Sequence, residues 1–156
     1  MNEDNVIFYP LAVLINAGIR IDEIFKNKKV ERYPEGFLLI TEFIEKTLSI
    51  IISFKFASLR INHKQISREE GTKMYNYFDQ LSFIQKNKLS YYLGLIDKET
   101  FNELEDFRNK RNLYIHKFIF VPKDANIMDV YELSNKIIPK LTKILIQYYS
   151  NFFSNK

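Results

Sequence analysis

Apolar residues recur at intervals of three and four along most of the chain, which is the spacing of one face of an α-helix. The pattern predicts about five helices, over residues 10–27, 37–61, 79–93, 98–117 and 127–153. Polar connectors separate them, and the polar stretch 62–72 is predicted to be a loop. The second segment is apolar on most sides, so it is predicted to lie at the centre of a bundle.

Local signals mark several helix ends. Asp97 is a good N-cap for the fourth helix, and Glu99 in the first turn suits the helix dipole. Gly94 stands where the third helix needs a residue in the left-handed conformation. Pro139 lies inside the fifth helix and is predicted to kink or divide it, because proline has no backbone N–H to donate.

The composition favours a single all-α domain. The chain has 156 residues, of which 46% are hydrophobic and 27% charged, so it can bury a core of ordinary size. Only four glycines and four prolines are present, whereas folds rich in sheet need many turns. We therefore expect residues 1–156 to form one up-and-down helical bundle.

Composition and charge also exclude several kinds of functional site and indicate where in the cell the protein works. No cysteine is present, which excludes disulfides, thiolate nucleophiles and cysteine-based zinc sites. The start of the chain is acidic rather than basic, and the apolar stretches are shorter than the roughly 20 residues that span a bilayer. We expect a cytoplasmic protein with no membrane association. The net charge of +4 favours polyanionic partners only weakly.

One charged residue interrupts the apolar face of the fourth helix. On a helical projection, Arg111 falls within the apolar stripe formed by Leu104, Phe107, Tyr114, Ile115 and Phe118. A buried guanidinium group without a partner would be very unfavourable. Arg111 is therefore predicted either to make an ion pair with an acidic residue of another helix, or to face a cleft or a partner subunit.

A polar ridge runs beside this stripe, where Arg108, Asn112 and His116 follow one another at i, i+4 spacing. Arg111 and His116 are separated by about 7.5 Å of helical rise and point about 140° apart on an ideal helix. The long arginine side chain can still converge with the imidazole on one phosphate group.

The segment Arg111-Asn112-Leu113-Tyr114-Ile115-His116 resembles the signature of HEPN domains, a family of small helical bundles. That signature is an arginine, a polar residue, three to five further residues and a histidine. The preceding stretch is similar as well, because Leu81-Ser82-Phe83 begins the helix before it and Leu93-Gly94-Leu95-Ile96 ends that helix. The detailed resemblance covers residues 81–117.

The resemblance implies a metal-independent ribonuclease that acts as a homodimer, with two copies of the motif facing each other across the interface. It implies RNA as the substrate, no metal ion and no cofactor. Catalytic members serve in toxin–antitoxin, phage-defence or CRISPR systems. Some toxins are silenced by a nucleotidyltransferase antitoxin that modifies a tyrosine two residues after the histidine, where this chain has Phe118. Other members are inactive regulators, including mannitol-repressor-like proteins, so a non-catalytic protein-binding module is the alternative.

The residue types in the motif suit RNA cleavage, because RNA carries its own nucleophile in the 2′-hydroxyl. An imidazole such as that of His116 can take or give a proton at cellular pH. Arg111 can grip two oxygens of the phosphate, and Asn112 can orient the imidazole or hold the phosphate. The expected reaction is transesterification, which leaves a 2′,3′-cyclic phosphate and a 5′-hydroxyl.

Three further basic residues flank the motif. Arg108, Lys110 and Lys117 can bind neighbouring phosphates of the RNA, although solvated surface charges explain Lys110 and Lys117 equally well. A plain structural bundle, in which Arg111 makes only an internal ion pair, is the third interpretation that the sequence leaves open.

Overall fold

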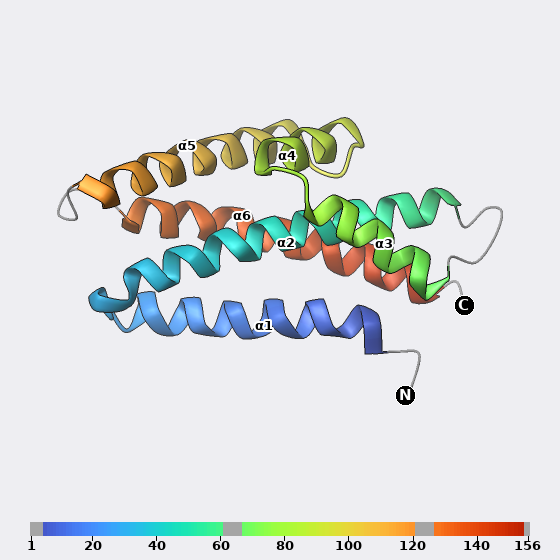
Figure 1. Ribbon diagram of the computed structural model, residues 1–156, viewed down its shortest axis with the longest axis horizontal. Coiled ribbons are helices and arrows are strands. Elements are labelled where there is room, and N and C mark those ends of the chain that lie inside the picture. The colour runs from blue at the N-terminus through green and yellow to red at the C-terminus, as the bar shows by residue number, and fades with distance from the viewer. Residues whose placement is uncertain (1–4, 61–66, 121–126, 155–156) are drawn as a thin grey trace.

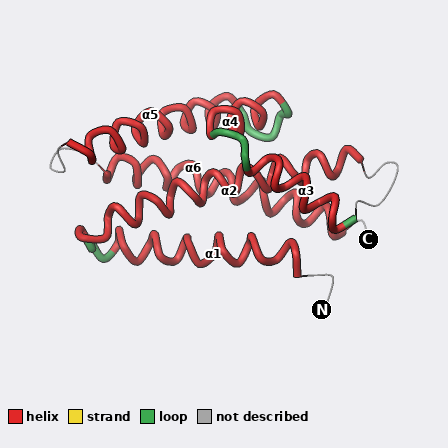
Figure 2. The backbone as a smooth tube through the Cα atoms, in the orientation of Figure 1, coloured by secondary structure: helices red, strands yellow, loops and turns green. Residues whose placement is uncertain are grey.

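The computed structural model describes residues 5–60, 67–120 and 127–154, and within them the side chains of residues 12–59, 67, 69–115 and 127–151. The described residues form α-helices, one short 3-10 helix and no strand (Figures 1 and 2). The elements are α1 (Asn5–Lys26), η1 (Val30–Arg32), α2 (Tyr33–Arg60), α3 (Arg68–Asp79), α4 (Phe83–Tyr92), α5 (Lys98–Phe120) and α6 (Ile127–Ser154). The predicted all-α bundle is confirmed.

Helix α2 is the central helix, as its apolar sequence predicted. It packs against α1, α3, α4 and α6. Figure 1 shows α1 running antiparallel to α2 on one side of the bundle, and α5 running antiparallel to α6 on the other. The short helix α4 contacts both α2 and α5. Helix α5, which carries the motif, therefore rests on α4 and α6.

The core lies along one face of α2, where fully buried apolar residues recur at intervals of three and four: Ile40, Ile44, Leu48 and Ile51. Ile137 and Leu141 of α6, which packs against α2, are equally buried. Full burial of such a side chain contributes about 1.5 to 3 kcal/mol relative to exposure. None of the described helices has the length and apolar character needed to cross a bilayer.

The start and the body of α5 are fixed by separate contacts. The backbone N–H of Thr100 donates to the Asp97 side chain at 2.7 Å, which confirms the predicted N-cap and lowers the pKa of that carboxyl group. Lys140 of α6 donates to Glu99 and to Glu103, at 2.9 Å each. These contacts attach the first turns of α5 to α6.

The predicted helix over residues 79–93 corresponds to α4, but α4 begins at Phe83, because Asp79 belongs to α3 and a break around Ser82 separates the two helices. Helix α3 also begins inside the predicted loop 62–72. Its capping box is reciprocal: the Glu70 N–H donates to the Ser67 hydroxyl at 3.2 Å, and the Ser67 N–H donates to the Glu70 carboxylate at 3.1 Å. The Ser82 N–H donates to the Gln85 side chain at 2.9 Å, in a second box of the same kind.

Other boundaries differ less. Helix α2 begins at Tyr33 rather than near Phe37, with Pro34 in its first turn, where a missing N–H is harmless. Helix α6 continues through Pro139 and is not divided. Gly94 has the predicted left-handed conformation, with φ of 67°. Of the predicted connector 119–126, residues 119 and 120 belong to α5, and the rest lies outside the described residues.

Candidate functional site

Two aromatic contacts fix the direction of the motif face of α5. Phe107, one turn before Arg111, is fully buried and stacks on Phe83 of α4, with ring centroids 5.8 Å apart. Tyr114, nearly one turn after Arg111, packs against Phe37 of α2, with ring centroids 4.5 Å apart. Because both neighbours point inward, the sequence forces Arg111 toward the bundle as well.

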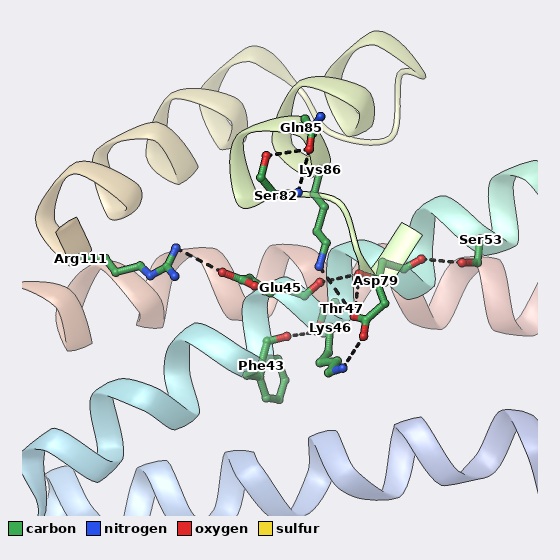
Figure 3. A network of polar contacts seen from close by, with 11 residues as sticks. Phe43, Glu45, Lys46, Thr47, Ser53, Asp79, Ser82, Gln85, Lys86 and Arg111 are labelled. Atoms are coloured by element: carbon green, nitrogen blue, oxygen red, sulfur yellow. Dashed lines mark hydrogen bonds and ion pairs between the residues drawn. The ribbon is translucent and has the colours of Figure 1, made fainter. Parts of the chain in front are cut away.

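Arg111 makes an ion pair with an acidic residue of another helix, which is one of the alternatives that the sequence left open. Its Nη1 atom lies 3.2 Å from Oε1 of Glu45 on α2 (Figure 3). The guanidinium carbon lies 5.9 Å from the centroid of the Phe83 ring. The side chains of Arg111 and Glu45 are 24% and 27% exposed, so the pair is half-buried at the edge of the bundle. The buried Nε atom of Arg111 has no acceptor among the described residues.

The basic residues that flank Arg111 have their own acidic partners. Arg108 pairs with Glu105 at 3.1 Å, and Lys110 pairs with Asp106 at 2.6 Å, both within α5. Glu105 also accepts a hydrogen bond from the buried Asn87 of α4 at 2.7 Å. Arg108 and Lys110 could therefore bind phosphate, as expected, only if these ion pairs opened or if each cation contacted its carboxylate and a phosphate at the same time.

The other predicted residues on this part of α5 are Asn112, His116 and Lys117. Asn112 follows Arg111 on the exposed side of α5. His116 and Lys117 belong to α5, but their side chains lie outside the described residues, as does that of Phe118. The structure thus places Arg111 and Asn112 at successive positions of α5, with Arg111 turned toward α2 and Asn112 toward solvent. The meeting of Arg111 with the imidazole stays a prediction.

A buried lysine lies near Glu45, on the side away from Arg111 (Figure 3), and it was not among the residues predicted from the sequence. Lys86 of α4 is 1% exposed, and its ammonium group lies 3.7 Å from Asp79 at the end of α3 (Figure 3). Asp79 also pairs with Lys46 at 2.6 Å and accepts from the Ser49 hydroxyl at 3.3 Å. Burial lowers the pKa of Lys86, while the charges of Asp79 and Glu45 raise it in part.

The inward face of α4 is mostly polar, which is unusual for a helix inside a bundle. Lys86, Asn87 and Ser90 are all buried, with Phe83 as the apolar exception. Asn87 Oδ1 and Ser90 Oγ have no hydrogen-bond partner among the described residues. The sequence does carry a signal of this polar face. Residues 83–92 lack an apolar stripe, although they lie between two segments with clear helical patterns.

The arrangement offers one partly exposed guanidinium group, paired with a carboxylate of α2, and an exposed amide at the next position of α5. Among the described residues, no group of three or more acidic or histidine side chains is placed to hold a metal ion. A shallow hollow lies over Phe56, Met74 and Tyr77 of α2 and α3, and none of the described motif residues lines it. Comparisons with family models, curated proteins and solved structures find no match to this chain.

Proposed function

We propose that this protein is an endoribonuclease that cleaves RNA by attack of the 2′-hydroxyl group and needs no metal ion. The observation that carries the proposal is the partly exposed guanidinium group of Arg111, which lies on the same helix as the exposed Asn112 and as His116. Arginine binds phosphate oxygens through two parallel N–H donors, and such a donor pair stabilises the charge that develops in the transition state.

In the proposed reaction, the 2′-oxygen loses its proton to a base, forms a bond to phosphorus and displaces the 5′-oxygen, which takes up a proton. His116 performs one or both proton transfers. Arg111 neutralises the phosphate, and Asn112 orients the imidazole or the phosphate. Arg108, Lys110 and Lys117 hold neighbouring phosphates once RNA competes for their charges.

We infer that the enzyme works as a homodimer in the cytoplasm, with the two motifs at the interface, and serves as a toxin or phage-defence effector. A composite site would place an imidazole from each copy on the same phosphate. A nucleotidyltransferase antitoxin is a candidate partner, but Phe118 offers no hydroxyl group for adenylylation, so its control would have to use another residue.

The test is digestion of mixed RNA in excess EDTA by the wild type, Arg111→Ala and His116→Ala. We expect cyclic-phosphate ends from the wild type and a loss of rate of at least about 100-fold in each variant. Lys136→Ala, which changes an exposed lysine on α6, is the matched control and should cleave normally. Circular dichroism verifies that each variant is folded.

A non-catalytic protein-binding module, similar to mannitol-repressor-like regulators, is the second candidate. Two observations favour it: Arg111 already has Glu45 as a partner, and apolar Leu113 and Ile115 are 56% and 39% exposed beside it. Wild-type protein that leaves diverse RNAs intact, and whose expression does not slow cell growth, would replace the ribonuclease proposal by this one.

A further inference from the structure

We propose that Glu45 of α2 is a positioning residue, which orients the guanidinium group of Arg111 toward the scissile phosphate. This inference rests on the proposed ribonuclease function. Glu45 was not among the residues that the sequence motif suggested, because it lies on another helix and far away along the chain.

The geometry holds the guanidinium group from two sides. Nη1 lies 3.2 Å from Oε1 of Glu45, and the ring of Phe83 on α4 lies 5.9 Å from the guanidinium carbon. A carboxylate and an aromatic ring together restrict both the direction and the plane of an arginine side chain. Figure 3 shows Arg111 extending from α5 toward Glu45 on α2, so the contact spans two helices.

The charges around Glu45 keep its carboxylate in place. Arg111 lies on one side, and the ammonium group of Lys86 is close enough on the other for the Glu45 charge to raise its pKa. Lys86 is 1% exposed and its ammonium group lies 3.7 Å from Asp79, so it cannot swing into solvent to follow Glu45. Lys46, the next residue along α2, pairs with Asp79 and does not compete for Glu45.

The partial exposure of the pair separates a functional role from a structural one. About a quarter of each side chain reaches solvent, so a phosphate can approach the guanidinium group without breaking its contact with Glu45. Ion pairs at this level of exposure stabilise a fold only slightly. A fixed arginine, by contrast, does not lose rotamer freedom when it binds the transition state, which raises the rate of the chemical step.

The experiment compares Glu45→Ala, Glu45→Gln and the control Glu42→Ala in single-turnover RNA cleavage, with thermal melting of each protein. Glu42 is an exposed acidic residue on the same helix. We expect Glu45→Ala to lower the rate of the chemical step by about 10-fold, with little change in RNA affinity. Glu45→Gln keeps an acceptor oxygen for Arg111 and should stay within about threefold of the wild type. Glu42→Ala should match the wild type.

The outcomes separate this inference from the proposed function. If the wild type cleaves RNA and folded Glu45→Ala cleaves equally fast or faster, Glu45 does not position Arg111, and the ribonuclease proposal stands. If Glu45→Ala only lowers the melting temperature, with an unchanged rate per folded molecule, the pair is structural and the inference is overturned. A wild type that is inert on RNA overturns both proposals together.

Discussion

At the scale of single residues, Lys86 is the least expected feature of the protein. A fully buried ammonium group loses its hydration, and the attraction to Asp79 at 3.7 Å offsets only part of this desolvation free energy. Asp79 itself has closer partners in the ammonium group of Lys46, at 2.6 Å, and in the hydroxyl group of Ser49. Lys86 therefore weakens the fold, and its carboxylate partner does not depend on it.

We predict that Lys86→Met leaves the free energy of unfolding unchanged or raises it by up to about 2 kcal/mol at pH 7, since methionine fills a similar volume without a charge. Urea denaturation of both proteins measures the difference. Lys86→Ala is the matched control and should be destabilising by about 2 to 4 kcal/mol, because it leaves a cavity. A loss of about 3 kcal/mol or more in the methionine variant would instead identify Lys86 as an essential ion-pair partner.

The pH dependence follows from the lowered pKa of Lys86 in the folded protein. Below that lowered pKa, Lys86 is charged in both states and contributes no slope. Between it and the unfolded-state value near about 10.4, the unfolded chain binds more protons, so Lys86 makes the folded state more stable as the pH rises. The advantage of Lys86→Met should therefore shrink between pH 7 and pH 10.

At the scale of helices, the contact between α1 and α2 depends on a glycine. A Cβ atom added to Gly36 would lie 2.5 Å from the ring of Phe25. That ring cannot easily move, because it stacks on Tyr33 at 5.0 Å and on Tyr131 at 4.3 Å. This aromatic stack joins the end of α1 to the beginnings of α2 and α6.

We predict that Gly36→Ala lowers the free energy of unfolding by about 1 to 3 kcal/mol, because the added methyl group overpacks the aromatic stack. Gly71→Ala is the matched control. Gly71 lies inside α3, and a Cβ there meets nothing within 4 Å, so this substitution should stabilise the protein by about 0.4 to 1 kcal/mol. Thermal or urea denaturation measures both changes. Equal effects of the two substitutions would contradict the role assigned to the stack.

At the scale of the whole molecule, several helices leave apolar side chains exposed, and α1 and α5 are two of them. Ile15 and Ile19 of α1 are 64% and 62% exposed, and Leu113 of α5 is 56% exposed next to Asn112. Figure 1 shows these helices on opposite sides of the bundle. The proposed homodimer would use the α5 side, because only that side carries the motif.

We expect light scattering to show a dimer at micromolar concentration. Leu113→Asp should raise the dissociation constant of the dimer by roughly 10-fold or more, because it buries a charge at the proposed interface. Ile15→Asp, an equally exposed position on α1, should leave it unchanged. A strict monomer would rule out a composite site, and a dimer broken only by Ile15→Asp would move the interface to α1.

Sequence signals were reliable where the physics is local. The cap at Asp97 and the left-handed Gly94 follow from hydrogen bonds and backbone sterics within a few residues. The serines that begin α3 and α4 gave equally local signals, which the hydrophobic pattern obscured because α3 is polar and α4 has almost no apolar stripe. Of the two outcomes predicted for Pro139, division of the helix is wrong, because α6 continues through this residue despite the missing N–H donor.

Most of the helices, the central position of α2 and the need of Arg111 for a partner follow from the sequence alone, because periodicity and the free energy of burying a charge can be evaluated along one helix. The identity of that partner, Glu45, and the burial of Lys86 near it are visible only in the folded protein. The physical reason is that both facts depend on how α2, α4 and α5 face one another. That packing is set by side-chain contacts between residues far apart in the chain, and no spacing along the sequence encodes them.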